Sequence, residues 1–186
     1  MSAQPEIHLG ELHEGHVGLT HNLWGSYCEA ACVCLDKHHT TPRSLDVDVD
    51  GDEQTCVLHW GPATPTMQRA HGNRIDATEF GAYAISFACL ERIMSLFCVA
   101  RTDHATGADW YVAPLGHGLD EYGIIDKDSP ELLALEVSGT DKEAVEPRVL
   151  EKVEQLRRGS TCARGLAVVV GFEQAQVKIA QVDLEG

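Results

Sequence analysis

Residues 132–139, LLALEVSG, place a carboxylate in the middle of an apolar segment. Side chains alternate between the two faces of a strand, so Glu136 and Ser138 share one face with Leu132 and Ala134. The opposite face consists of Leu133, Leu135 and Val137. A buried carboxylate is costly unless it is paired or bound to a metal. The segment therefore predicts a buried strand that carries a functional acid.

A second acid precedes an earlier apolar segment, residues 107–112, GADWYV. Asp109 stands directly before Trp110, and we expect this strand to neighbour the one that carries Glu136. Two such carboxylates can share a magnesium or manganese ion, which prefers oxygen ligands. An ion of this kind can polarise a phosphate and activate a water molecule for in-line attack.

A helix is expected over about residues 142–158, ended by Gly159. Its apolar stripe consists of Val145, Val149, Val153 and Leu156. Beside that stripe, Arg148, Lys152 and Gln155 recur at i, i+4 and i+7. Such a row is typical either of a solvated face or of a surface that meets nucleic-acid phosphates. The basic cluster continues with Arg157, Arg158 and Arg164.

The remaining segments of the second half predict an α/β fold with a central mixed β-sheet flanked by helices. A long helix is expected from Asp76 or Thr78 to about Phe97, and its apolar stripe consists of Phe80, Tyr83, Phe87, Leu90, Met94 and Phe97. Short strands are expected at residues 97–101, 165–172 and 176–182. Strand, helix and strand in succession indicate a parallel crossover.

The N-terminal part predicts a strand within residues 6–17, a helix over about 20–37, and a β-hairpin around Asp50-Gly51. Residues 61–74 are expected to form a loop. The acidic run before Gly51 resembles a calcium-binding loop, but Val57 stands where a bidentate Glu is required. We expect one domain over residues 1–186, with an N-terminal part of residues 1–75 and a core of residues 76–186.

Composition limits the function classes. The net charge of −15 is unusual for a nuclease, because neutralising phosphates drives nucleic-acid affinity. A local basic face or a partner subunit would have to supply those contacts, and the same charge suits an adaptor that binds a basic partner. Seven cysteines without a secretion signal favour reduced thiols and a cytoplasmic protein. The apolar stretch 82–100 is interrupted by charged residues, which argues against a membrane span.

Histidines are frequent near the N-terminus: His8, His13, His16, His21, His38 and His39. They lack the HExxH spacing of zinc hydrolases, and glycines interrupt the segment that carries the first four. A His-rich metal-binding protein remains a weaker alternative. The glycine-rich phosphate loops and the GxSxG nucleophile motif are missing from the sequence.

The order of segments resembles the PD-(D/E)xK nuclease superfamily, which has the restriction-endonuclease-like fold. The matching segments are EFGAYAISFACLERIM, GADWYVAP, LALEVSGT, AVEPRVLEKVEQLRRG and LAVVVGF, within residues 76–182. The resemblance implies a magnesium- or manganese-dependent nuclease that hydrolyses nucleic-acid phosphodiesters. It implies Asp109 and Glu136 as metal ligands, Glu79 as an auxiliary acid and Gln155 as the helix glutamine. Glu79 is equally explained as a first-turn acid that complements the helix dipole.

Ser138 departs from the superfamily motif, which implies a lysine two residues after Glu136. That lysine orients the attacking water or stabilises charge, whereas serine can hydrogen-bond but carries no positive charge. Either a displaced lysine, Lys142 or Lys152, takes its place beside Ser138, or cleavage has been lost. In the second case the chain is an inactive nuclease-fold subunit or adaptor that binds a protein partner or a second copy of itself.

Overall fold

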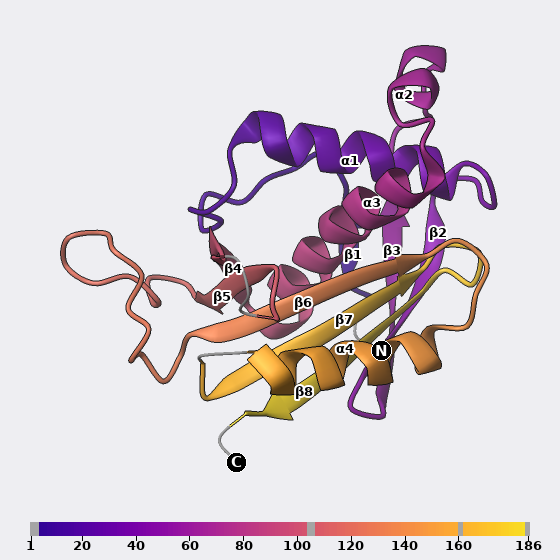
Figure 1. Ribbon diagram of the computed structural model, residues 1–186. Coiled ribbons are helices and arrows are strands. Elements are labelled where there is room, and N and C mark those ends of the chain that lie inside the picture. The colour runs from indigo at the N-terminus through magenta and orange to yellow at the C-terminus, as the bar shows by residue number, and fades with distance from the viewer. Residues whose placement is uncertain (1–3, 104–106, 160–161, 185–186) are drawn as a thin grey trace.

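The computed structural model describes residues 4–103, 107–159 and 162–184 (Figure 1). Its strands are β1 (Glu6–His8), β2 (Arg43–Val49), β3 (Asp52–His59), β4 (Leu96–Arg101), β5 (Trp110–Pro114), β6 (Leu133–Thr140), β7 (Arg164–Gly171) and β8 (Gln176–Asp183). Its helices are α1 (His21–Leu35), α2 (Pro65–Ala70), α3 (Arg74–Cys89), the π-helical turn η1 (Leu90–Met94) and α4 (Val145–Gly159). All eight strands form one mixed sheet, in the order β1–β3–β2–β8–β7–β6–β5–β4.

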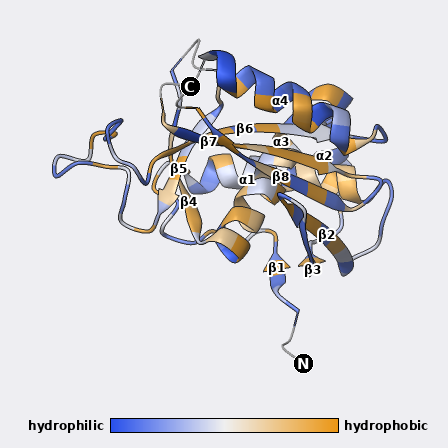
Figure 2. Cartoon of the chain, turned by 90° about the horizontal axis from the view of Figure 1, so that it is seen from below, coloured by the Kyte–Doolittle hydropathy of each residue, from blue (hydrophilic) through white to orange (hydrophobic). Residues whose placement is uncertain are grey.

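The sheet is covered on both faces. Leu135 and Val137 of β6 pack in the same core cluster as Tyr83 of α3, whereas Ala134 packs in the cluster that contains Leu156 of α4. Because successive strand residues point to opposite faces, α3 and α4 lie on opposite sides of the sheet. Figure 1 shows α4 in front of the strands and α3, with α1, behind them. In Figure 2, α4 carries both hydrophilic and hydrophobic residues, as expected for a helix with one solvated face.

Strands β4 to β7 contain the predicted crossover. β4 pairs with β5 and β5 with β6 in antiparallel fashion, and β6 pairs with β7 in parallel. The connection from β6 to β7 runs through α4, because parallel neighbours require a long crossover. The predicted α/β class with a mixed sheet and flanking helices is confirmed.

The N-terminal hairpin is part of the same sheet. Asp50 and Gly51 both have positive φ angles, of 51° and 91°, which is the backbone that a two-residue hairpin turn requires. β2 then pairs in parallel with β8, so the hairpin continues the sheet instead of forming a separate appendage. β1 lies outside β3 as a three-residue edge strand.

Several predicted boundaries were wrong. The first strand ends at His8, and the expected loop 61–74 contains the short helix α2, which Thr64 caps. Helix α3 begins at Arg74, because the side chain of Asn73 accepts a hydrogen bond from the backbone N–H of Ile75. Asp109 lies one residue before β5.

The apolar stretch 82–100 is divided among three elements. α3 ends at Cys89, the turn η1 follows, and Ser95 adopts a left-handed conformation with φ of 54°. Phe97 therefore belongs to β4 and not to the helical stripe. Within the residues that the structure describes, no helix has both the length and the apolar character needed to cross a membrane.

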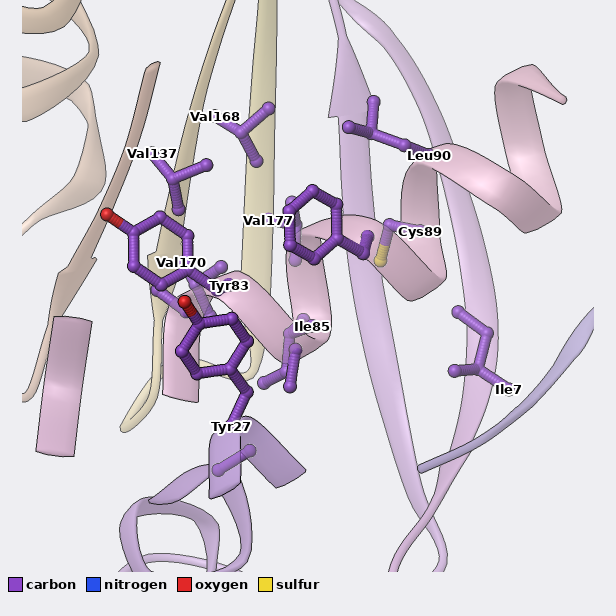
Figure 3. Close-up of a cluster of buried hydrophobic side chains, with 14 of the residues drawn as sticks. Ile7, Tyr27, Tyr83, Ile85, Cys89, Leu90, Val137, Val168, Val170 and Val177 are labelled. Carbon is purple, nitrogen blue, oxygen red and sulfur yellow. The ribbon is translucent and has the colours of Figure 1, made fainter. Parts of the chain in front are cut away.

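The main core lies between the sheet and the α1–α3 layer. Figure 3 shows Tyr27 and Tyr83 beside Val137, Val168 and Val170. Six of the cysteines are buried here as small core residues: Cys28, Cys32, Cys34, Cys56, Cys89 and Cys98. Burial raises the pKa of the Cys32 and Cys34 thiols to about 11, so both thiols are protonated at neutral pH.

Gly139 fixes the approach of α3 to β6. A Cβ atom at this position would stand 2.3 Å from the carbonyl oxygen of Thr78, in the first turn of α3. Any side chain at residue 139 would therefore push the start of α3 away from the strand. This close contact places the part of α3 that contains Glu79, the next residue, beside β6.

Candidate active site

A pocket of about 630 Å³ opens beside β6, between the start of α3 and the exposed side of α4. We call it the β6–α4 pocket. Seven residues that the sequence indicated line it: Glu79, Asp109, Glu136, Ser138, Arg148, Lys152 and Gln155. Glu136 and Ser138 reach it because both occupy the face of β6 that α4 covers.

Glu136 is an almost fully buried acid, with 2% of its surface exposed. Its Oε1 atom accepts a hydrogen bond from Nζ of Lys152 at 2.5 Å. Its Oε2 atom is buried and has no hydrogen-bond partner within the described part of the chain. Buried carboxylate oxygens are normally satisfied, so this oxygen marks a place where a further ligand fits.

The pKa of Glu136 rises from its ordinary value near 4.5 to about 7. Burial is the main cause, and the negative charge of Asp109 is the second. The Lys152 ammonium acts in the opposite direction and does not cancel them. Perturbation by burial together with a like charge is typical of functional sites.

Asp109 is held beside Glu136 by the backbone of β6. Its own N–H donates to the carbonyl of Leu135 at 2.8 Å, and its Oδ2 atom accepts from the N–H of Val137 at 3.0 Å. Asp109 thus extends the β5–β6 ladder by one residue and turns its carboxylate toward the strand that carries Glu136. The predicted pair of neighbouring acids is brought together in this way.

Lys152 and Gln155 come from α4. Nζ of Lys152 also donates to Oε1 of Gln155 at 3.1 Å, so one lysine connects the helix glutamine to Glu136. Ser138 lies on the same pocket face of β6 and is 9% exposed. Lys142, the other candidate for a displaced lysine, precedes α4, and it is not among the residues that line the pocket.

Glu79 is exposed at the rim of the pocket. The hydroxyl of Tyr83, one turn later on α3, donates to Oε1 of Glu79 at 3.4 Å. Burial raises the pKa of Tyr83, and the charges of Asp109 and Glu79 raise it further. Sequence reasoning placed Tyr83 in the apolar stripe and missed this polar role, although its spacing of four residues from Glu79 was the available signal.

Only some of the basic residues predicted to bind nucleic acid line the pocket. Arg148 lines the pocket and pairs with Glu151 at 3.1 Å. Arg157 pairs with Glu154 at 2.9 Å, and neither Arg157 nor Arg158 lines the β6–α4 pocket. Of the predicted nucleic-acid-binding residues, only Arg148 and Lys152 thus lie in the pocket with the acids.

Arg74 and Asp141 also line the pocket, and neither of them was singled out from the sequence. Nε2 of His38 lies 2.8 Å from Oδ1 of Asp141, and Arg74 lies 3.8 Å from its Oδ2 atom. Burial works to raise the pKa of Asp141, but the hydrogen bond from His38 and the charges of Lys37 and Arg74 lower it overall. Asp141 is therefore a stably charged acid at the pocket rim.

A divalent cation fits this donor set. Carboxylate oxygens from Asp109 and Glu136 are the ligands that magnesium and manganese prefer. The unpartnered Oε2 of Glu136 supplies a free lone pair, while its other oxygen stays with Lys152. Asp109 and Glu136 could thus hold a cation, with the Lys152 ammonium close by.

No protein-family model, no curated protein and no solved structure matches this chain.

Proposed function

We propose that this chain is a divalent-metal-dependent nuclease-like protein that hydrolyses nucleic-acid phosphodiesters. The proposal includes a restriction-endonuclease-like core made of α3, β4 to β7 and α4. The order of elements supports it: a helix, three antiparallel strands, a second helix and a strand parallel to the third. Apart from β4, which the matching segments do not include, this is the order that the sequence resemblance implied.

The observation that carries the proposal is the position of Lys152. The resemblance requires a lysine beside the second acid, and Ser138 occupies the motif position. Nζ of Lys152 lies 2.5 Å from Glu136, although the lysine comes from a helix 16 residues later. A positive charge is therefore available beside Asp109 and Glu136 without the motif lysine.

Each of the pocket residues has its own role in the proposed hydrolysis. Asp109 and Glu136 would hold magnesium or manganese, which when bound supplies a Lewis acid for a phosphate oxygen. Lys152 holds a proton and a positive charge next to the reacting phosphate, where such charge stabilises the transition state. Gln155 orients the Lys152 ammonium through its amide oxygen. Arg148 at the rim offers a bidentate contact for a neighbouring phosphate.

The net charge of −15 limits the substrate contact to this rim. Arg74 and Arg148 both line the pocket, so phosphate contacts are concentrated beside the acids and do not form an extended basic face. Binding through so few cations predicts weak affinity and a shallow dependence on salt.

A direct test uses the purified protein with magnesium or manganese on single- and double-stranded DNA and RNA. Glu136→Ala should lower the cleavage rate by about 100-fold or more, because one of two metal ligands is lost. Glu146→Ala is the matched control, since Glu146 is an exposed acid on α4 outside the pocket lining. Cleavage that is undiminished in Glu136→Ala would contradict the proposal.

A second candidate is a catalytically inactive subunit or adaptor with the same core. The −15 charge and Ser138 favour it. It predicts a folded protein that neither binds manganese in the β6–α4 pocket nor cleaves any of these nucleic acids.

A further inference from the structure

The edge of the sheet farthest from β4 carries a second group of metal-ligating side chains, outside the β6–α4 pocket. Glu6 and His8 lie on β1, and His59 lies at the end of β3. One candidate ligand atom on each of the three lies within 4.8 Å of the other two. Among the described residues, no other group of three or more His, Cys, Asp or Glu side chains has its ligand atoms within that distance of one another.

The strand geometry explains why the three side chains meet. β1 and β3 run parallel, with His8 directly opposite His59 and Glu6 opposite Val57. Glu6 and His8 are two residues apart and share the outer face of β1, while Ile7 between them is buried. All three polar side chains therefore point to the same side of the sheet edge.

The distances suit a single tetrahedral ion. Nε2 of His8 lies 3.4 Å, and Nε2 of His59 lies 4.0 Å, from Oε2 of Glu6. Ligands about 2.0–2.1 Å from a tetrahedral zinc ion stand roughly 3.3 Å apart.

Two further observations point to a ligand at this place. Nε2 of His59 is a buried nitrogen without a hydrogen-bond partner in the described chain, and the 4.0 Å to Glu6 is too long for a hydrogen bond. The imidazole rings of His8 and His59 are stacked, with centroids 4.3 Å apart and an interplanar angle of 11°. The stacking keeps the two rings side by side, and Nε2 of each lies within 4.0 Å of Oε2 of Glu6.

We propose that Glu6, His8 and His59 form a binding site for a zinc-class transition-metal ion that links edge strand β1 to β3. Two imidazoles and one carboxylate are the donors that zinc accepts, with water in the fourth position. The mixed nitrogen and oxygen donors separate this site from the all-carboxylate pair of the β6–α4 pocket, which suits magnesium and manganese. The bound ion holds the three-residue strand β1 against the hairpin.

The test is a calorimetric titration of zinc chloride into the full chain near pH 7.5. It is carried out in the Glu136→Gln background, so that zinc uptake by the β6–α4 pocket does not contribute. One zinc ion per chain is expected, with thermal unfolding shifted upward by added zinc because the ion binds the folded state. The result is independent of the proposed nuclease activity, which this background lacks.

His8→Ala and His59→Ala should each weaken zinc binding at least about tenfold, because a direct ligand is lost. His21→Ala is the matched control, since His21 is an exposed histidine on α1, and it should leave the affinity unchanged. If His59→Ala does not fold, as judged by circular dichroism, His8→Ala decides the matter, because His8 is exposed at the sheet edge. Absence of zinc binding, or equal binding in His8→Ala and the control, would overturn the proposal.

Discussion

Two acid–lysine pairs in this protein have opposite electrostatic character. Asp48 of β2 and Lys178 of β8 face each other across neighbouring strands, with Nζ 2.9 Å from Oδ2. Glu136 of β6 and Lys152 of α4 are joined at 2.5 Å. By contact alone, both are ordinary salt bridges.

The surroundings of the two acids differ. The hydrogen bond from Lys178 lowers the pKa of Asp48, and the N–H of Gly51 donates to its other oxygen at 2.6 Å. Burial and Asp109 raise the pKa of Glu136 to about 7 despite Lys152, and one oxygen of Glu136 has no partner in the described chain. Both carboxylate oxygens of Asp48 have a partner, whereas Glu136 keeps an unpartnered oxygen whose negative charge a cation would stabilise.

The comparison teaches that a lysine contact does not by itself mark a site. A second acid and an unpartnered oxygen distinguish the Glu136 pair. The same change made in each pair should therefore have different effects.

The largest expected contrast is in cleavage rate. Lys152→Met removes the positive charge beside Asp109 and Glu136 and should lower kcat by about 100-fold, as loss of one electrostatic contact to the transition state does. Lys178→Met should change kcat less than about twofold. Steady-state cleavage with manganese measures both, and equal losses in the two variants would remove the distinction between the pairs.

A smaller effect is expected from restoring the motif lysine. Ser138 lines the pocket on the same face of β6 as Glu136, so Ser138→Lys places an ammonium group beside the two acids. In the Lys152→Met background, this change should recover about tenfold in kcat. No recovery in a folded double variant would mean that the lysine must approach from α4.

Much of this site followed from local sequence pattern. The alternation of LLALEVSG placed Glu136 and Ser138 on one face of a buried strand, and the strand–helix–strand order predicted the parallel β6–β7 crossover. The helical spacing placed Lys152 and Gln155 on one row of α4. These features are set by periodicity within a few residues, which a sequence displays directly.

Other features depend on contacts between distant segments. The choice of Lys152 over Lys142 follows from the start of α4 at Val145, which local pattern placed three residues too early. The meeting of His8 with His59 requires parallel pairing of β1 with β3, across 51 residues of sequence. Neither the strand register nor the exact helix start is encoded by short-range spacing.

The smallest expected contrast is in the pH dependence of stability, measured without metal. Between about pH 4.5 and 7 the unfolded chain has released the Glu136 proton while the folded chain retains it, so stability falls as pH rises and the loss is complete above about 7. Glu136→Gln removes this loss. The free energy of unfolding of the variant, relative to that of wild type, should therefore increase by roughly 2 kcal/mol from pH 5 to pH 8.

Asp48→Asn should show the opposite sign. The pKa of Asp48 is lowered from its ordinary 3.8, so its stabilising effect is present above that value and is lost as pH falls through the folded pKa. The variant should be about 1 kcal/mol less stable than wild type at pH 7 and equal to it at strongly acid pH. Urea unfolding at several pH values measures both variants, and parallel pH profiles would contradict the assignment of opposite shifts.

Calorimetric titration with manganese measures whether Asp109 and Glu136 together hold a divalent cation. We predict one manganese ion bound in the pocket of the wild-type chain, with affinity at least about tenfold weaker in Glu136→Gln and unchanged in Asp48→Asn. Manganese binding that is equal in all three folded proteins, or absent from wild type, would contradict the account.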